Sequence, residues 1–212
     1  RNGQLGTFFK VNGEEYAVSA PGAFSVYNAV AAITVCRHYG IDQEIIRKAL
    51  KTIRVPGRVE VIDNDRGYLL LIDYAHNAMS LKNILETMRR YHPRQLWVLF
   101  GCGGGRSAAR RREMGCVAGK YADFTVITSD NPRYEEPERI MQTIEEGMKE
   151  TKGQYQMMVD RKEAMRFMLA QGRPGDILIL AGKGHEQYQE IKGDYLPFNE
   201  RKIAQEILAD LD

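Results

Sequence analysis

Residues 175–189 read GDILILAGKGHEQYQ, a short apolar run that ends in a glycine-rich turn. A continuous run of branched aliphatic residues indicates a strand covered on both faces, the usual situation in a parallel sheet flanked by helices. Similar runs recur along the chain. We expect strands at RVEVID (58–63), YLLLIDYA (68–75), QLWVLFG (95–101), DFTVITS (123–129), YQMMV (155–159) and DILILAG (176–182).

The segments between these strands show apolar residues at helical spacing, and helices are expected over about 78–91, 107–121, 137–150, 161–171 and 199–210. Strands that alternate with helices predict an α/β fold, a Rossmann-like, mostly parallel sheet with helices on both faces and right-handed crossovers. Ligands of such sheets bind beyond the carboxyl ends of the strands. The residues that directly follow each strand are therefore the candidate site residues.

The beginning of the chain has a different pattern. LGTFFKVNGEEYAV predicts a β-hairpin with its turn at Asn12-Gly13. Helices are expected over 22–39 and 42–53, the second with Asp42 as its N-cap.

A domain boundary is expected after these elements. Pro56-Gly57 interrupts both helix and strand, so we predict two domains, residues 1–55 and 56–212, with a hinge between them. Because the chain begins with Arg1 inside a hairpin, without Met, we interpret it as part of a longer protein.

The composition excludes several classes of protein. Hydrophobic residues make up 43% of the 212 residues, which suits a folded core, and the net charge of +2 gives no reason to expect nucleic acid. No apolar run approaches the roughly 20 residues that cross a bilayer. The three cysteines, Cys36, Cys102 and Cys116, show no CxxC spacing, which argues against zinc and against a disulfide framework.

AGKGHE (181–186) has some features of a phosphate-binding loop without meeting its requirements. A P-loop has the pattern G-x-x-x-x-G-K-[S/T], and its hydroxyl binds magnesium. Here Gly184 follows Lys183, and Ile177 stands where the first glycine is needed. The turn ends in Glu186, which we expect to be exposed and to bind an ammonium group, with Lys183 as a supporting residue.

GCGGGR (101–106) ends another expected strand. Successive glycines let backbone N–H groups come close to a ligand, and the helix N-terminus that follows favours anions. We interpret Arg106 as an anion-binding residue, because a guanidinium can hold a carboxylate or phosphate through two hydrogen bonds. The basic run Arg110–Arg112 is equally consistent with anion binding and with a basic face exposed to solvent.

SDNPR (129–133) combines an acid, an amide and a base, Asp130, Asn131 and Arg133, around a proline that stiffens the turn. Such a set suits a zwitterionic ligand, for example an amino acid. The alternative is an Asx-turn that caps the following helix, and the two interpretations are compatible.

DYAHN (73–77) ends an apolar strand with Asp73 and carries Tyr74 and His76 on the loop that follows. The Tyr74 ring could stack on a base or ribose, and it could equally be a core residue. A histidine beside an acid and an aromatic ring at a sheet edge is a candidate site residue.

These four motifs, in this order and spacing, resemble those of the C-terminal domain of the Mur ligases, from about Pro21 to the end of the chain. GAFSVYNAVAA (22–32) looks like the last helix of the family's central ATP-binding domain, and VPGRVEVI (55–62) like its junction to the C-terminal domain. The resemblance implies that residues 1–55 are a remnant of the central domain and that 56–212 are the amino-acid-binding domain. DNPR resembles the form found in members that add meso-diaminopimelate.

The resemblance also implies roles for individual residues. Positions that contact the nucleotide in the family correspond to Asn28, Arg58, Asp73, Tyr74 and His76. Positions that bind the incoming diamino acid correspond to Arg106, Asp130, Asn131, Arg133, Gly182 and Glu186. Of these, Arg133 is expected to bind a carboxylate and Glu186 an ammonium group.

The implied activity is ATP-dependent amide formation in peptidoglycan biosynthesis. A carboxylate of UDP-N-acetylmuramoyl-L-alanyl-D-glutamate takes the γ-phosphoryl group of ATP, and the amine of meso-diaminopimelate attacks the acyl phosphate. The implied cofactor is Mg²⁺, whose main ligands, like the family's modified lysine, would precede residue 1. The sequence has no GTxGKT-like loop, so we expect no catalytic residue in this chain and no turnover by it alone. The resemblance implies a cytoplasmic monomer without nucleic-acid partners.

Two motifs depart from the family pattern. The family's DYAHTPDAL is DYAHNAMSL here, and its GCGGDRDxxKRP is GCGGGRSAARRR. Gly105 and Ser107 replace two acids, which makes the loop around Arg106 more positive. A related ligase that adds another amino acid, such as L-lysine, and a non-catalytic amino-acid-binding module therefore remain alternatives.

Overall fold

The computed structural model describes residues 5–211 of a chain that divides into two compact units, Arg1–Val55 and Pro56–Asp212. The first unit has the elements β1 Thr7–Val11, β2 Glu14–Val18, α1 Ala23–His38 and α2 Gln43–Thr52. The hairpin of β1 and β2 turns at Asn12 and Gly13, whose φ angles are 51° and 84°, as a two-residue hairpin turn requires. Asp42 caps α2 by accepting hydrogen bonds from two backbone N–H groups. The predictions for this turn and this cap are confirmed.

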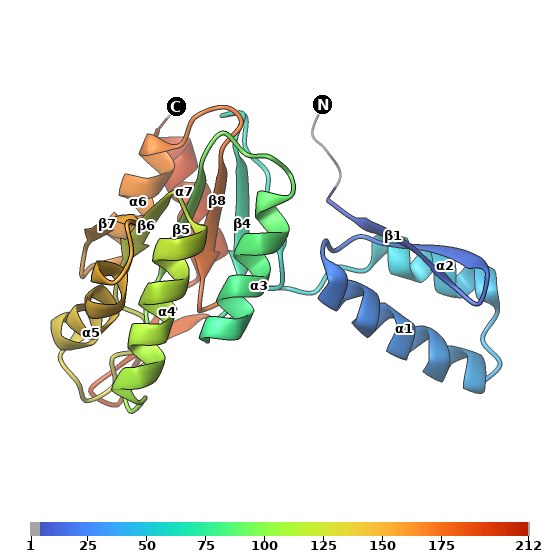
Figure 1. Ribbon diagram of the computed structural model, residues 1–212, viewed down its shortest axis with the longest axis horizontal. Helices are drawn as coiled ribbons and strands as arrows, with labels where there is room; N and C mark the ends of the chain where they lie inside the picture. The colour runs from blue at the N-terminus through green and yellow to red at the C-terminus, as the bar shows by residue number, and fades with distance from the viewer. Residues whose placement is uncertain (1–4, 212) are drawn as a thin grey trace. The chain divides into compact units, whose positions relative to one another are not determined.

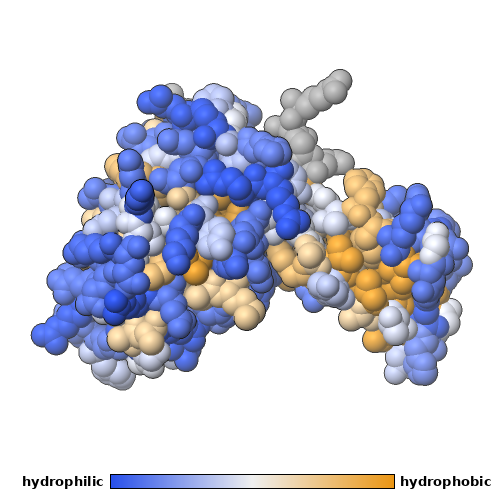
Figure 2. Space-filling model, viewed as in Figure 1, coloured by the Kyte–Doolittle hydropathy of each residue, from blue (hydrophilic) through white to orange (hydrophobic). Residues whose placement is uncertain are grey.

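The first unit combines a small core with an apolar surface. Its core consists of Tyr16, Val18, Ala29, Ile33, Ile46 and Leu50. Figure 2 shows apolar residues gathered over this unit, and its exposed large apolar side chains are Phe8, Tyr27, Val35, Tyr39, Ile41, Ile45, Ile53 and Val55. Apolar surface of this kind is typical of protein contact sites.

The second unit is built on a six-stranded sheet with the strand order β3-β4-β8-β5-β6-β7. Its elements are β3 Glu60–Ile62, β4 Leu69–Asp73, α3 Ala78–Arg89, β5 Leu96–Phe100, α4 Ala108–Tyr121, β6 Phe124–Ile127, α5 Pro137–Lys149, β7 Gln154–Met157, α6 Arg161–Gln171, β8 Ile177–Ala181, β9 Tyr188–Ile191, β10 Asp194–Pro197 and α7 Glu200–Asp210. All pairings in this sheet are parallel except that of β3 with β4. The prediction of a mostly parallel α/β sheet is confirmed.

Helices cover both faces of this sheet. Helices α3, α4 and α5 lie on one face, and α6 and α7 lie on the other (Figure 1). Strands β5 and β8 are buried along their whole length, which is why both read as unbroken apolar runs. None of the helices within residues 5–211 is long and apolar enough to cross a membrane.

The structure contains a hairpin that the sequence patterns did not indicate. Strands β9 and β10 form it directly after AGKGHE. None of their residues is fully buried, so no alternation of apolar and polar residues marks them. The hairpin joins the SDNPR loop, because Arg133 donates its backbone N–H to the carbonyl of Glu190 (2.9 Å) and accepts that of Lys192 (2.7 Å).

Candidate functional site

Four motif-bearing loops lie side by side at one edge of the sheet. Strands β4, β8, β5 and β6 are consecutive and parallel, so their carboxyl ends meet at this edge. In that order they lead into DYAHN, AGKGHE, GCGGGR and SDNPR. This is the position at which parallel α/β sheets bind ligands.

Lys183 connects AGKGHE with SDNPR. Its side chain is fully buried, and its Nζ lies 3.3 Å from Asp130 Oδ1, 3.0 Å from Asn131 Oδ1 and 3.2 Å from Glu186 Oε2. Asn131 Nδ2 also donates to Glu186 Oε2 (2.9 Å). Two loops more than 50 residues apart in sequence therefore form one polar network.

The expectation that Glu186 is exposed is wrong. Its side chain is 19% exposed, because the turn folds it back over Lys183 and Asn131. Its Oε2 atom accepts from both of these residues, whereas Oε1 lies 3.4 Å from the Tyr74 hydroxyl, at the limit of a hydrogen bond. Oε1 is thus the oxygen of Glu186 with capacity for a further donor.

Asn131 does not cap the helix that follows it. Helix α5 has Glu136 at its N-cap position, with no side-chain cap, and Pro137 in its first turn. Asn131 Oδ1 accepts from Lys183 and from the backbone N–H of Glu190 (3.0 Å). The Asx-turn interpretation is wrong, because the amide is used by the two neighbouring segments.

Arg133 is held between two loops. Its Nε donates to Glu190 (2.9 Å) and its Nη1 to the carbonyl of Gly104 (2.6 Å). Its φ angle of 54° is unusual for a residue with a side chain, which is consistent with a conformation imposed by these contacts. The Arg133 side chain is 34% exposed, and its Nη2 has no hydrogen bond to another described residue.

The glycines of GCGGGR allow close packing between two loops. A Cβ atom at Gly101 would lie 2.3 Å from the carbonyl oxygen of Thr128, and one at Gly104 would lie 2.0 Å from that of Pro132. These two glycines therefore let the backbone approach SDNPR rather than a ligand. Arg106 is exposed and makes no hydrogen bond or ion pair with another described residue.

The basic run that follows is not a solvated face throughout. Arg111 is buried and donates to both oxygens of Glu135 (2.8 and 2.9 Å), and Glu135 also accepts the backbone N–H of Gly105 (2.6 Å). Arg112 pairs with Glu150, the residue that directly follows α5. Arg111 and Glu135 thus join the glycine loop to the segment before α5.

We predict that Glu135→Gln removes a pH-dependent stabilisation. The hydrogen bonds from Arg111 lower the pKa of Glu135 from 4.5 to about 2. A lowered folded-state pKa stabilises the fold above the unfolded-state value, and this stabilisation is lost as the pH falls toward 2. Because the carboxylate is 39% exposed, solvent screening limits the expected loss at pH 7 to about 1 kcal/mol or less.

Urea denaturation of both proteins at neutral and acidic pH measures this effect. Trp97, the single tryptophan, lies in β5 and reports on the second unit. The difference in the free energy of unfolding between the wild-type protein and Glu135→Gln should shrink as the pH falls below 4.5. An equal difference in the free energy of unfolding at all pH values would contradict the prediction.

Four of the predicted nucleotide-contacting residues cluster around Tyr74. The Arg58 guanidinium lies 4.6 Å from the centre of the Tyr74 ring, and the His76 ring lies 4.6 Å from it. Burial raises the pKa of Asp73, whose two oxygens accept the backbone N–H groups of Val59 and Ala75 (both 2.9 Å). Asp73 therefore fixes the loop conformation. Its contact with a nucleotide remains a prediction.

Asn28 and Asn77 have different surroundings. Asn28 is exposed on α1 of the first unit, and its role remains a prediction. Asn77 caps α3, forming with Ser80 a reciprocal pair of side-chain to backbone hydrogen bonds. Helix capping thus explains the asparagine at position 77, where the family pattern DYAHTPDAL has threonine.

Sequence reasoning missed Glu190 and the buried Arg161, and it treated Lys183 only as a supporting residue. A lysine between two glycines at a strand end is a signal that could have indicated an inward turn. Glu190 lies on the unpredicted hairpin and had no signal. Arg161 donates to the carbonyls of Ser129 (3.2 Å) and Ala181 (2.8 Å), contacts that only the assembled sheet creates.

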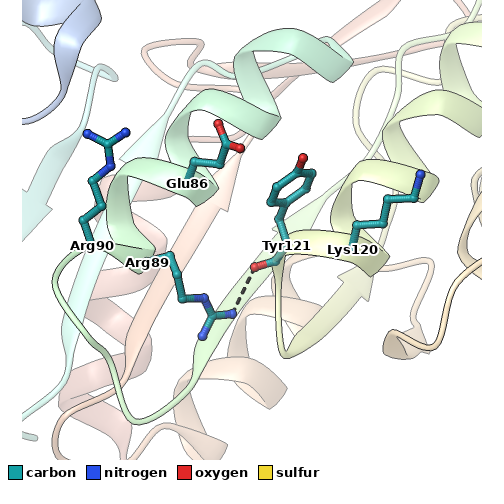
Figure 3. A pocket seen from close by; sticks show the side chains of 5 residues that line it. All are labelled: Glu86, Arg89, Arg90, Lys120 and Tyr121. Carbon is teal, nitrogen blue, oxygen red and sulfur yellow. Dashed lines mark hydrogen bonds between the residues drawn. The ribbon is translucent and has the colours of Figure 1, made fainter.

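A surface depression lies elsewhere on this unit, between the carboxyl-terminal ends of α3 and α4 (Figure 3). Its lining residues are Glu86, Arg89, Arg90, Lys120 and Tyr121. Arg89 donates to the carbonyl of Tyr121 (3.0 Å) and pairs with Asp123. These cations are well explained by the negative ends of the two helices.

The parallel sheet and the charged loops at its carboxyl edge define an α/β domain suited to a polar ligand. Residues 57–184 match the family model described as Mur ligase, glutamate ligase domain. The chain belongs to the Mur ligase family.

Curated relatives share one name, UDP-N-acetylmuramoyl-L-alanyl-D-glutamate–2,6-diaminopimelate ligase. The protein of Caldanaerobacter subterraneus subsp. tengcongensis is 46% identical over 214 residues, which is 99% of this chain and 44% of the relative. That of Aquifex aeolicus is 40% identical over 208 residues, 98% of this chain and 43% of the relative. The chain thus spans less than half the length of these relatives.

Solved structures agree with the family assignment. A structure bearing the same ligase name superimposes with a TM-score of 0.71 at 35% identity, covering 96% of this chain and 42% of that one. Folylpolyglutamate synthase from Thermotoga maritima gives a TM-score of 0.61 at 16% identity, covering 80% and 38%. The second likeness concerns the fold alone.

Proposed function

We propose that this chain is the amino-acid-binding part of an ATP-dependent ligase that adds meso-diaminopimelate to UDP-N-acetylmuramoyl-L-alanyl-D-glutamate in peptidoglycan biosynthesis. The observation that carries this proposal is the network at the sheet edge. It holds the carboxylate of Glu186 against Asn131 and Lys183, and Arg133 follows Asn131 by two residues in the SDNPR loop. A carboxylate and a guanidinium on two adjoining loops suit an amino acid, and the relatives' names supply the substrate class.

In the proposed reaction, a carboxylate of the UDP-linked dipeptide takes the γ-phosphoryl group of ATP. The amine of the diamino acid attacks the resulting acyl phosphate, an amide bond forms and phosphate leaves. The residues described here bind and orient the diamino acid. Glu186 would accept from an ammonium group, and Arg133 and Arg106 would donate to carboxylates. Fixing the amine near the acyl group replaces a bimolecular encounter and lowers the barrier by several kcal/mol.

The Tyr74 cluster provides a candidate surface for the nucleotide. The ring, with Arg58 on it and His76 beside it, offers stacking and positive charge. Residues 5–211 contain no cluster of three or more His, Cys, Asp or Glu side chains that could hold a metal ion. We therefore propose no described residue as a ligand of the Mg²⁺ that the family implies.

The expected preference for meso-diaminopimelate over L-lysine follows from the positive charge at the site. Meso-diaminopimelate carries a carboxylate that lysine lacks, and both Arg106 and the Arg133 Nη2 group have donors without acceptors among the described residues. We expect meso-diaminopimelate to bind at least about tenfold more tightly than L-lysine, since a charged hydrogen bond contributes about 1.5–3 kcal/mol.

Isothermal calorimetry with meso-diaminopimelate, L-lysine and L-ornithine tests this preference. Tighter binding of lysine would instead support a lysine-adding ligase. Ligation is assayed with the product of the whole gene, because the 212 residues include no GTxGKT-type loop. Amino-acid binding without ligation by that product would favour a non-catalytic module. Because the proposed substrates are ATP and a UDP-linked precursor, we propose that the enzyme acts in the cytoplasm, as a monomer.

A further inference from the structure

Lys183 is a buried cation with all its hydrogen-bonding capacity used. Its Nζ has three acceptors within 3.3 Å, on Asp130, Asn131 and Glu186. An ammonium group has three protons to donate, so these contacts saturate it. Lys183 thus has no donor left for a phosphate or a substrate carboxylate, and any role in binding must pass through its three partners.

The two flanking glycines explain how the lysine enters the interior. Gly182 and Gly184 have φ angles of 109° and 56°, which turn the backbone so that the side chain between them points beneath the loop. A Cβ atom at Gly184 would lie 2.7 Å from the Cβ of Tyr74. Gly-Lys-Gly therefore inserts a lysine under the loop and does not form a phosphate cradle.

We propose that Lys183 is a positioning residue for the substrate's ammonium group. Its contacts fix the Glu186 carboxylate and the Asn131 amide, so that Glu186 Oε1 faces the ligand. This inference rests on the proposed function, because it concerns the same amino-acid site.

The hydrogen-bond directions support this assignment. Asn131 Oδ1 accepts from Lys183 Nζ (3.0 Å) and from the Glu190 backbone N–H (3.0 Å), which turns Asn131 Nδ2 toward Glu186. Glu186 Oε2 then accepts from Asn131 Nδ2 and from Lys183 Nζ. These two hydrogen bonds use both lone pairs of Oε2, which leaves no capacity for a third donor. Of the two Glu186 oxygens, Oε1, near the Tyr74 hydroxyl, has the capacity to accept a substrate ammonium.

The charge of the cluster supports it as well. The carboxylates of Asp130 and Glu186 share the single ammonium of Lys183, which leaves one negative charge for a cationic ligand. Removing Lys183 would leave two uncompensated carboxylates facing each other, and their repulsion would move Glu186 from its position. The neighbouring ion pair of Arg161 and Glu200 is neutral and cannot replace this charge.

Steady-state kinetics of the whole enzyme with Lys183→Met tests the proposal. We expect the KM for the diamino acid to rise at least about tenfold, and the KM for ATP and for the UDP-linked substrate to stay within about threefold. Lys192→Met is the matched control, because it makes the same change at an exposed lysine of the adjacent hairpin. The double variant Lys183→Met/Glu186→Gln should be no worse than Glu186→Gln alone, since both act through one carboxylate.

An unchanged diamino-acid KM, an equal rise for all three substrates, or additive effects in the double variant would overturn the proposal. Lys183→Arg is the second variant if the methionine protein does not fold. It keeps the charge, but a planar guanidinium cannot satisfy the same three acceptors, so a smaller selective rise is expected. No selective rise there would also overturn the proposal. A wild-type enzyme that ligates no diamino acid would refute the proposed function instead, and the Lys183 variants would then be compared by direct binding of the amino acid that it does bind.

Discussion

Glu186→Gln is expected to raise the KM for the diamino acid by about 10- to 150-fold, with the KM for ATP within about threefold of wild type. The charged acceptor proposed for the substrate ammonium is lost, and hydrogen bonds to charged groups contribute about 1.5–3 kcal/mol. The loss is larger if the new amide places its NH₂ group against Lys183 or Asn131, which already donate to this position. This is the largest effect on binding that we expect from one substitution.

Initial-rate kinetics with each substrate varied in turn measures this effect. Glu113→Gln serves as the control, because it neutralises an exposed carboxylate on α4. A larger effect on the KM for ATP than on that for the diamino acid would assign the AGKGHE loop to the phosphates and contradict the prediction.

Arg161→Met is expected to lower the free energy of unfolding of the second unit by about 3–5 kcal/mol. Arg161 and Glu200 are fully buried and form an ion pair of 2.8 Å. Burial raises the pKa of Glu200, and the positive charge of Arg161 counteracts this rise. The Oε2 atom of Glu200 has no hydrogen-bond partner among the described residues. Without Arg161 the Glu200 carboxylate would be a lone buried charge.

The same substitution would also loosen the site. Arg161 donates to the carbonyls of Ser129 and Ala181, at the ends of the two strands that lead into SDNPR and AGKGHE. Its loss leaves both buried carbonyls without this donor. We therefore expect weaker amino-acid binding together with the loss of stability.

Urea denaturation followed by Trp97 fluorescence measures the stability change. Arg166→Met is the control, because Arg166 and Asp210 are 36% and 60% exposed in their ion pair, which should contribute about 1 kcal/mol or less. The double variant Arg161→Met/Glu200→Leu should recover part of the loss, since no buried charge then remains unpaired. A loss below about 1 kcal/mol in Arg161→Met would contradict the prediction.

Much of the fold could be predicted because its signals are local. The apolar runs of β5 and β8 were recognisable because both sheet faces are covered, and the ends of the helices lie within two residues of the expected ones. Asn12-Gly13 and Asp42 act through hydrogen bonds and φ angles within a few residues. The loops that follow the strands could be grouped because parallel strands carry their carboxyl ends to one edge.

The β9–β10 hairpin could not be predicted for the opposite reason. Its strands are short and none of their residues is fully buried, so they lack a periodic apolar pattern. The hairpin is held by hydrogen bonds to the SDNPR loop, more than 50 residues away in sequence. Arg133 was likewise assigned a ligand role without the knowledge that Glu190 occupies its Nε.

The sequence by itself determined the order of the helices and of the strands other than β9 and β10, the two units' separate patterns and the residue types that gather at the sheet edge. Only the tertiary structure decided which of those groups are available to a ligand. Glu186 was expected to be exposed, yet it is part of a network centred on the buried Lys183. The physical reason is that a polar side chain's partners are set by spatial proximity, and Lys183 and Asn131 are 52 residues apart in the chain. Burial makes such contacts obligatory, because an unpaired charge in the interior is strongly destabilising.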